Sequence, residues 1–222
     1  MMPLGEAFYK RKVAAIQNRL GPERLDGLLL LDMPNVVYAS GFVHIPSERP
    51  LGLYIPASGN PVLFVPLLEQ ENAAETWIGD IRTYFEYPGE EHPIVWMVRE
   101  AGGARLGIDA LSVSLARLVG ERLSLTLLVE HMRWVKEPEE IALIKQAASY
   151  ADFCLEYVRE HMAAIVRDGG TELDILQACM DATMDQMQRD LDTKYGRRGL
   201  KVTGTVHSGP RAALPHGEPM ER

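Results

Sequence analysis

The sequence has few of the features that mark secreted, membrane or nucleic-acid-binding proteins. Its 222 residues include two cysteines, and Lys and Arg form no dense cluster. No apolar run comes near the roughly 20 residues that a membrane-spanning helix needs. The formal net charge is -8, from 31 acidic and 23 basic residues. These absences argue against a transmembrane helix and against a basic surface for nucleic acid.

A secretion signal and a disulfide framework are also missing. Residues 1–12 mix Glu6 with three basic residues and contain no apolar core, so we expect a cytoplasmic protein. Cys154 and Cys179 each lie in an apolar stripe with helical spacing. We therefore expect each thiol to act as a small buried hydrophobe and not as half of a disulfide.

Common catalytic motifs are incomplete in this sequence. Residues 102–107 are rich in glycine but precede a predicted strand, whereas a dinucleotide-binding loop follows one. His216-Gly217-Glu218 has the spacing of a zinc deaminase motif, yet both cysteines lie upstream of it. The sequence contains no His-Glu-x-x-His and no Gly-x-Ser-x-Gly motif. The remaining histidines have no metal-ligand spacing and are expected to be structural: His44, His92, His131, His161 and His207.

The hydrophobic content of 46% is enough for a buried core, and its pattern predicts an α/β fold. After a helix expected over residues 7–20, short apolar runs alternate with helical stretches. The turn-rich residues 57–60 join two such runs and predict an antiparallel hairpin, hence a mixed sheet. Strands are expected over residues 27–31, 52–56, 62–65, 81–85, 105–109 and 125–129.

The pattern changes near residue 133, where long helices replace the alternation. Apolar residues spaced by three and four predict a helix over residues 139–166, with Pro138 in its first turn. Asp168-Gly169-Gly170 ends that helix, and Thr171 with Asp174 predicts the cap of a second one. A loop is expected over residues 195–199 and a strand over 200–206. The expected inner stripe of the second helix is Leu173, Leu176, Met180, Met184, Met187 and Leu191.

Three segments, taken in order, resemble the pita-bread family of Xaa-Pro aminopeptidases, prolidases and creatinases. Residues 33–42 resemble its Asn-x-x-Tyr-x-x-Gly-Phe segment, and residues 61–66 with Glu69 resemble the strand and helix start that follow. Residues 133–141, through Arg133, Lys136, Glu140 and Ile141, resemble the start of its catalytic domain. Residues 208–217 resemble a loop near its active site.

The resemblance implies an N-terminal creatinase-like α/β domain over residues 1–132 and the first helices and first strand of an α+β pita-bread domain over residues 133–222. It also implies that a full-length parent holds two divalent metals, Mn, Co or Zn, on ligands that follow the position of His216. His216 itself matches a histidine that hydrogen-bonds substrate or intermediate without binding metal, so it is the expected catalytic residue. We expect neither a cofactor nor a metal ligand within this chain.

Three functions remain open at this point. The first is the N-terminal portion of a dinuclear Xaa-Pro peptidase, inactive alone, whose parent acts on small peptides. The second is a creatinase-like amidinohydrolase, which uses acid-base chemistry centred on histidine without metal. The third is a binding or assembly module without catalysis. By analogy with family relatives we expect a homodimer, and the composition predicts neither nucleic acid nor membrane as a partner.

Overall fold

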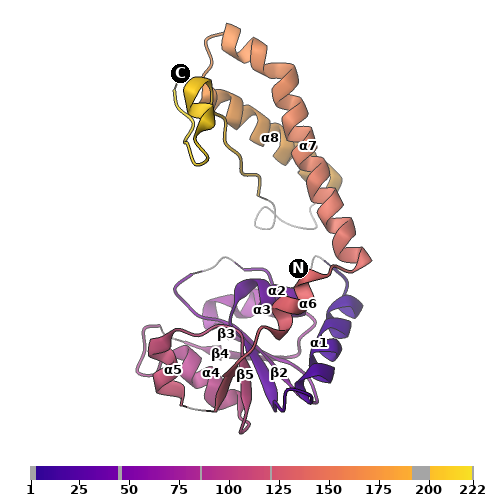
Figure 1. The fold of residues 1–222 in the computed structure, drawn as a ribbon, viewed down its shortest axis with the longest axis vertical. Helices are drawn as coiled ribbons and strands as arrows, with labels where there is room; N and C mark the ends of the chain where they lie inside the picture. Colours follow the sequence, from indigo (N-terminus) through magenta and orange to yellow (C-terminus); the bar gives the residue numbers. More distant parts are fainter. Residues whose placement is uncertain (1–3, 45–46, 86, 121, 192–200, 222) are drawn as a thin grey trace. The chain divides into compact units, whose positions relative to one another are not determined.

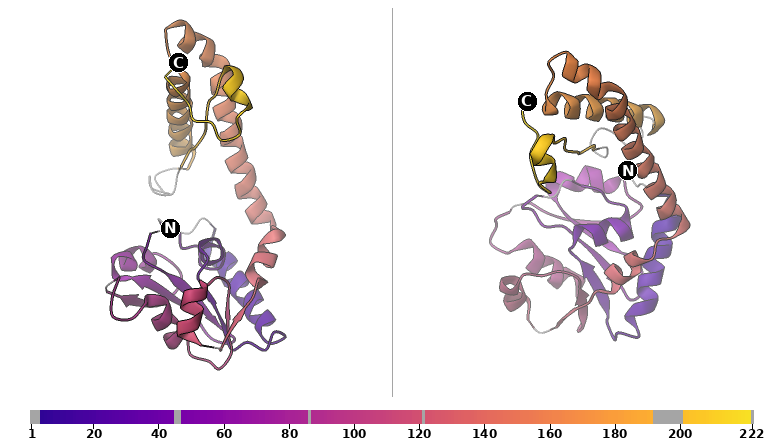
Figure 2. Two further views of the ribbon diagram at one scale, coloured as in Figure 1. Left: turned by 60° about the vertical axis from the view of Figure 1, so that its left-hand side comes forward. Right: turned by 45° about the horizontal axis from the view of Figure 1, so that its top comes forward.

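The computed structural model describes residues 4–44, 47–85, 87–120, 122–191 and 201–221. These residues form two compact units, Met1–Val135 and Lys136–Arg222. The first contains a sheet with flanking helices, and the second contains two long helices and the C-terminal segment (Figures 1 and 2). The predicted boundary at residue 133 lies close to this division. The assignment of the second unit to a pita-bread domain stays a prediction.

The described part of the first unit contains one mixed sheet with the strand order β4-β3-β2-β1-β5-β6. β1 pairs antiparallel with β2 and parallel with β5, and β2 pairs antiparallel with β3. The outer pairs, β3 with β4 and β5 with β6, are parallel. This arrangement confirms the predicted α/β fold class, and the β2–β3 pairing confirms the predicted hairpin. The strands are β1 (Gly27–Leu30), β2 (Gly52–Pro56), β3 (Val62–Pro66), β4 (Asp80–Tyr84), β5 (Leu106–Ile108) and β6 (Leu123–Leu125).

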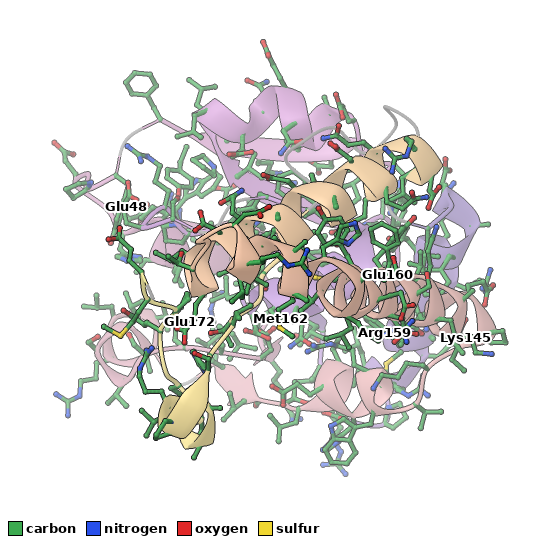
Figure 3. All side chains as sticks on the ribbon, turned by 90° about the horizontal axis from the view of Figure 1, so that it is seen from above. Glu48, Lys145, Arg159, Glu160, Met162 and Glu172 are labelled. Atoms are coloured by element: carbon green, nitrogen blue, oxygen red, sulfur yellow. The ribbon has the colours of Figure 1, made fainter. Side chains whose placement is uncertain are left out.

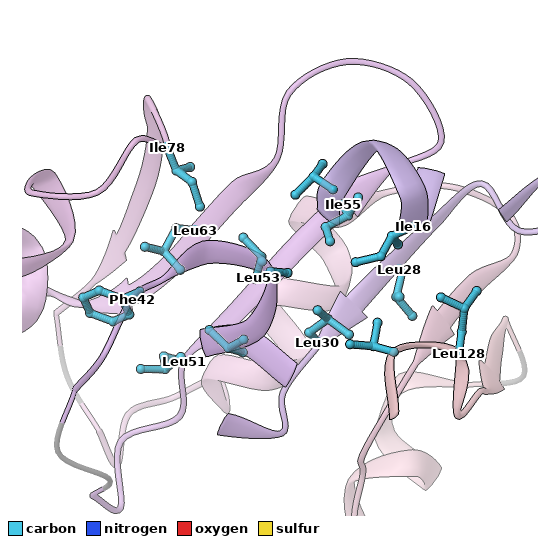
Figure 4. Packing of buried hydrophobic residues seen from close by; sticks show 14 of the residues in the cluster. Ile16, Leu28, Leu30, Phe42, Leu51, Leu53, Ile55, Leu63, Ile78 and Leu128 are labelled. Carbon is cyan, nitrogen blue, oxygen red and sulfur yellow. The ribbon is translucent and has the colours of Figure 1, made fainter. Parts of the chain in front are cut away.

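Buried clusters cover both faces of the sheet. Successive side chains of a strand point to opposite faces, so neighbouring residues of β1 enter different clusters. Leu28 and Leu30 of β1 belong to one buried cluster, which includes Ile16 of α1 (Figure 4). Leu29 belongs to the cluster on the other face, with Met97 of α4. Burial on both faces explains why the apolar run of β1 is continuous instead of alternating. The helices of this unit are α1 (Glu6–Leu20), α2 (Met33–Ser40), α3 (Gln70–Ala74), α4 (Pro93–Ala101), α5 (Val113–Val119) and α6 (Leu128–Trp134).

The last predicted strand of this unit was wrong. Residues 125–129 do not form a strand: β6 ends at Leu125, and α6 begins at Leu128. The Thr126 hydroxyl accepts a hydrogen bond from the Leu128 N–H, at 3.2 Å, and helps to start the helix. Leu128 and Val129 are buried as helix residues in the first cluster. A short apolar run does not distinguish a strand from a buried helical turn.

The second unit is built on α7 (Pro138–Arg167) and α8 (Glu172–Leu191), close to the predicted bounds. Glu137 and Glu140 form a reciprocal capping box at the start of α7, and Pro138 occupies its first turn as predicted. Thr171 and Asp174 exchange hydrogen bonds at the start of α8, which confirms the predicted cap. In the described parts of the chain, no helix is both long and apolar enough to cross a membrane.

The predicted inner faces of these helices were only partly right. Tyr150 is the buried residue of α7, whereas Ile144, Leu155 and Met162, which belong to the apolar stripe expected for this helix, are exposed. Two packed helices can bury only the narrow line where they touch, so most of a wider apolar stripe stays outside. In α8 the buried line lies beside the predicted one and consists of Glu172, Ile175, Cys179 and Thr183.

The predicted strand over residues 200–206 was wrong over its described part. Leu200 lies outside the described residues, and residues 201–206 carry no strand pairing. A strand needs a neighbour to satisfy its N–H and C=O groups, and the described part of the second unit provides none beside residues 201–206. The predicted loop over residues 195–199 also lies outside the described residues.

Candidate functional site

A buried carboxylate organises the C-terminal segment of the second unit. Glu172 is the first residue of α8, and its side chain is only 3% exposed. Figure 3 shows Glu172, labelled, beside the yellow C-terminal segment. A buried carboxylate needs hydrogen-bond donors or a cation to offset its lost hydration. The donors to Glu172 come from positions far along the chain.

Ser208 supplies two of these donors. Its backbone N–H lies 2.8 Å and its hydroxyl 2.6 Å from Oε1 of Glu172. Arg211 Nη1 donates to Oε2 at 3.1 Å, and the backbone N–H of Met220 donates to the same oxygen at 3.0 Å. Glu172 therefore holds both the beginning and the end of the segment 208–220. Hydrogen bonds to a charged group are stronger than those between neutral groups.

Local structure between these anchor points closes a loop. The 3-10 helix η3 (Gly209–Ala213) follows Ser208 and carries Arg211 inward. Arg211 also donates to the backbone carbonyl of Glu218. The guanidinium thus bridges the carboxylate of Glu172 and the far side of the loop.

His216, the predicted catalytic residue, lies in the turn of this loop and is exposed. The turn is closed by the Gly217 N–H, which donates to the Leu214 carbonyl at 3.4 Å. Within the described part of the chain, no hydrogen bond engages the His216 imidazole. Such an imidazole can donate or accept a hydrogen bond with an external ligand.

The structure brings a second histidine to this loop that sequence reasoning assigned only a structural role. His207 Nε2 lies 2.7 Å from the hydroxyl of Thr205. The ring also packs on Gly217, where an added Cβ would meet His207 Cε1 at 3.0 Å. His207 thereby supports the backbone beside His216, and a side chain at position 217 would push against its ring.

The segment Asn35 to Phe42 and the segment that begins at Arg133 meet in the first unit. Arg133 Nη1 donates to Asn35 Oδ1 at 2.9 Å, and Asn35 Nδ2 donates to Asp109 Oδ2 at 3.0 Å. Asp109 also accepts from the backbone N–H groups of Leu31 and Asp32, at 2.7 and 3.1 Å. Burial raises the pKa of Asp109, although these hydrogen bonds favour its charged form. This network joins β1, β5, α2 and α6, so its role is to stabilise the fold.

Neither Glu172 nor Asp109 was found from the sequence. Each is a single acid whose burial depends on distant elements, and no spacing rule marks such a residue. The capping pattern at Thr171 places Glu172 in a first helical turn, where an acidic side chain is ordinary. That position gave no signal that the carboxylate would be enclosed.

Clusters of metal-ligating side chains were sought among the residues that the structure describes. Across the described residues, no three His, Cys, Asp or Glu side chains gather closely enough to hold a metal ion. The C-terminal loop offers Glu172 and two histidines, but Glu172 is occupied by Ser208, Arg211 and Met220. The two histidines of this loop can form hydrogen bonds with a ligand.

The chain is similar to known proteins over most of its length. The family model described as the creatinase/prolidase N-terminal domain matches residues 12–137. An uncharacterized peptidase of Staphylococcus aureus (strain bovine RF122 / ET3-1) is 26% identical over 218 residues, which cover 95% of this chain and 58% of the relative. A similar peptidase of Staphylococcus epidermidis is 26% identical over 222 residues. The chain thus spans little more than half the length of these relatives.

Solved structures show the same fold. A prolidase from Thermococcus sibiricus superposes with a TM-score of 0.69 at 22% identity and covers 96% of this chain and 57% of that one. The Xaa-Pro dipeptidase from Bacillus anthracis gives a TM-score of 0.66 at 21% identity, with 96% and 57% covered. At such low identity the likeness concerns the fold alone.

Proposed function

Because the chain belongs to the creatinase/prolidase N-terminal domain family, we propose that it is the N-terminal portion of a metal-dependent Xaa-Pro peptidase of the aminopeptidase P or prolidase type. The observation that carries the proposal is the match to curated peptidases along nearly the whole chain. The substrate class, small peptides with proline in the second position, follows the names of the solved prolidases and Xaa-Pro dipeptidases.

The proposal assigns the metal ligands to sequence outside this chain. The matched region covers 58% of the Staphylococcus relatives, which leaves a substantial part of those proteins beyond it. On this account the 222-residue chain supplies the N-terminal domain, the α7–α8 helices and the His216 loop, and it does not hydrolyse peptides alone. Two divalent metals, Mn, Co or Zn, would bind in the longer protein.

His216 is the proposed catalytic residue of this portion. Its imidazole lies at an exposed turn, and Glu172 fixes both ends of the loop that carries it. A histidine N–H held in this way can donate a hydrogen bond to the scissile carbonyl oxygen as negative charge develops on it. His207, packed on Gly217, keeps the turn in place and acts as a positioning residue.

The role of His216 is tested by His216→Ala in the protein extended along its own gene to the stop codon. Loss of one donor to a developing oxyanion should lower kcat for an Xaa-Pro dipeptide by about 10²-fold, with a smaller effect on KM. His161→Ala, at an exposed position of α7, is the matched control and should leave kcat unchanged. An unchanged kcat in His216→Ala would remove His216 from the catalytic role.

We also propose that the chain forms a homodimer. The support is the exposed apolar surface of α7, where Leu155 is 69% and Val166 56% exposed. Apolar side chains that gather on an exposed surface can mark an interaction site. Sedimentation velocity of the wild type and of Leu155→Lys tests whether the dimer forms.

A further inference from the structure

The two cysteines of the chain, Cys154 and Cys179, lie on different helices of the second unit. Cys154 is on α7 and is half-buried, and Cys179 is on α8 and is 2% exposed. Both are free thiols, as the sequence predicted. The sequence treated them as two separate residues, whereas packing of α7 against α8 brings them together.

The two thiols are neighbours: after burial, the Cys154 thiol is a further cause of the raised pKa of the Cys179 thiol, whose Sγ donates to the Leu176 carbonyl at 3.1 Å. Both side chains line one cavity of about 690 Å³ that α7, α8 and residues 201–207 enclose. A small oxidant can enter a cavity of this size, so the pair is accessible even though Cys179 has little exposed surface.

We propose that Cys154 and Cys179 are a modification site, at which a peroxide converts the two thiols into an intrachain disulfide between α7 and α8. The proposal does not depend on the peptidase function. It requires two neighbouring thiols, an access route and an oxidant, and hydrogen peroxide serves as the oxidant.

The reaction balances in two steps. In the first, Cys154 Sγ attacks one oxygen of hydrogen peroxide, the O–O bond breaks, and the product is a Cys154 sulfenic acid; the released hydroxide takes the thiol proton and leaves as water. In the second, Cys179 Sγ attacks Cys154 Sγ, and the S–O bond breaks. The hydroxide released there takes the proton of Cys179 and leaves as a second water. Two electrons pass from the sulfur pair to the peroxide.

The environment of the thiols determines this order. Burial, together with the neighbouring Cys154, raises the pKa of Cys179 to about 11, so its thiolate is scarce at neutral pH. The thiolate is the nucleophile toward peroxide, which makes the more exposed Cys154 the first to react. Cys179 then acts as the resolving thiol, because its side chain lines the same cavity as the sulfur that becomes oxidised.

A first experiment detects the product in the full 222-residue chain. The reduced protein is treated with hydrogen peroxide, blocked with iodoacetamide and digested with trypsin without reductant. We expect one cross-linked species that joins the peptide 146–159, which contains Cys154, to the peptide 168–189, which contains Cys179. A reductant should separate it. Mixing ¹⁴N and ¹⁵N protein before oxidation should give no mixed-isotope cross-link, since the bond forms within one chain.

Two serine variants test the order of reaction. With dimedone present during oxidation, Cys179→Ser should accumulate the sulfenic acid adduct at Cys154, because no resolving thiol remains. Cys154→Ser should give at least about 10-fold less adduct at Cys179, whose thiolate is scarce. Serine replaces sulfur by oxygen with little change in volume, so both variants are expected to fold, and circular dichroism checks this.

A third measurement tests the proximity of Cys154 and Cys179 without oxidation. Phenylarsine oxide bridges two adjacent thiols, so it should bind the reduced chain one to one and bind either serine variant at least about 10-fold more weakly, by loss of the second sulfur ligand. Absence of the 146–159/168–189 cross-link, or its appearance only between isotopically different chains, would overturn the proposal. Equal arsenical binding by the wild type and the variants would overturn the proximity of the two thiols on which the proposal rests.

Discussion

The carboxylate of Glu172 accepts hydrogen bonds from both the backbone N–H and the hydroxyl of Ser208, at 2.8 and 2.6 Å. Glu172 and Ser208 lie 36 positions apart in the chain. The contact ties the start of α8 to the start of the loop that carries His216.

We predict that Glu172→Gln loosens the loop. An amide retains one acceptor oxygen but places an NH₂ group against donors, and it removes the charge that Arg211 neutralises. Hydrogen bonds to a charged group contribute about 1.5–3 kcal/mol each. Hydrogen exchange at the Ser208 and Met220 amides should therefore accelerate by at least about 10-fold, because a factor of ten corresponds to about 1.4 kcal/mol.

Asp185→Asn provides the control for that experiment. Asp185 is an exposed acid on the same helix, so its substitution makes the same change of charge without touching the loop. Surface substitutions of this kind usually change stability by less than about 0.5 kcal/mol. Unchanged protection of Ser208 in Glu172→Gln, or equal acceleration in both variants, would show that Glu172 does not hold the loop.

Asp109 should make the stability of the first unit depend on pH. Burial raises its pKa in the folded state above the ordinary value of 3.8. Between that value and the raised one, the folded state binds more protons than the unfolded state. The contribution of Asp109 is therefore fully present below the ordinary pKa and is lost as pH rises through the folded pKa.

Urea titrations of wild type and Asp109→Asn at a series of pH values from about 3.5 upward would measure this effect. The free energy of unfolding of the wild type, relative to that of Asp109→Asn, should fall as pH rises from the ordinary pKa of 3.8 through the raised pKa of folded Asp109. Above the raised pKa it should become constant. Glu71→Gln, an exposed acid on α3, should keep the wild-type pH dependence. A relative free energy that rises with pH would mean that hydrogen bonding outweighs burial at Asp109.

Leu155→Lys should weaken self-association. Leu155 is 69% exposed on α7, and a charge there opposes burial in an interface. The dimer dissociation constant from sedimentation velocity should rise by at least about 10-fold, which corresponds to 1.4 kcal/mol. Leu118→Lys makes the same change on α5, where Leu118 is 67% exposed, and should have no effect. A wild-type chain that sediments as a monomer at all concentrations would exclude the proposed homodimer.

The sequence predicted those parts of the fold that depend on local pattern. The continuous apolar run of β1, the hairpin around residues 57–60 and the capped starts of α7 and α8 each have a local signature, and the structure contains all of them. The short segment 125–129 was mistaken because four apolar residues suit a helix turn as well as a strand.

The features that sequence reasoning missed depend on distant contacts. Glu172 is buried only because residues 208–220 return to α8, and Asp109 only because β5 lies beside β1. The placement of Cys154 and Cys179 along one cavity likewise depends on how α7 packs on α8. No single window of sequence contains both partners of these contacts, so periodicity and spacing could not reveal them.

The central claim is tested most directly by hydrolysis of an Xaa-Pro dipeptide, with and without Mn²⁺, by the 222-residue chain and by the protein extended along its gene to the stop codon. The account predicts hydrolysis only by the extended, metal-loaded protein. Hydrolysis by the 222-residue chain itself would contradict its proposed inactivity, and silence of both proteins would contradict the peptidase assignment and favour a creatinase-like or non-catalytic role.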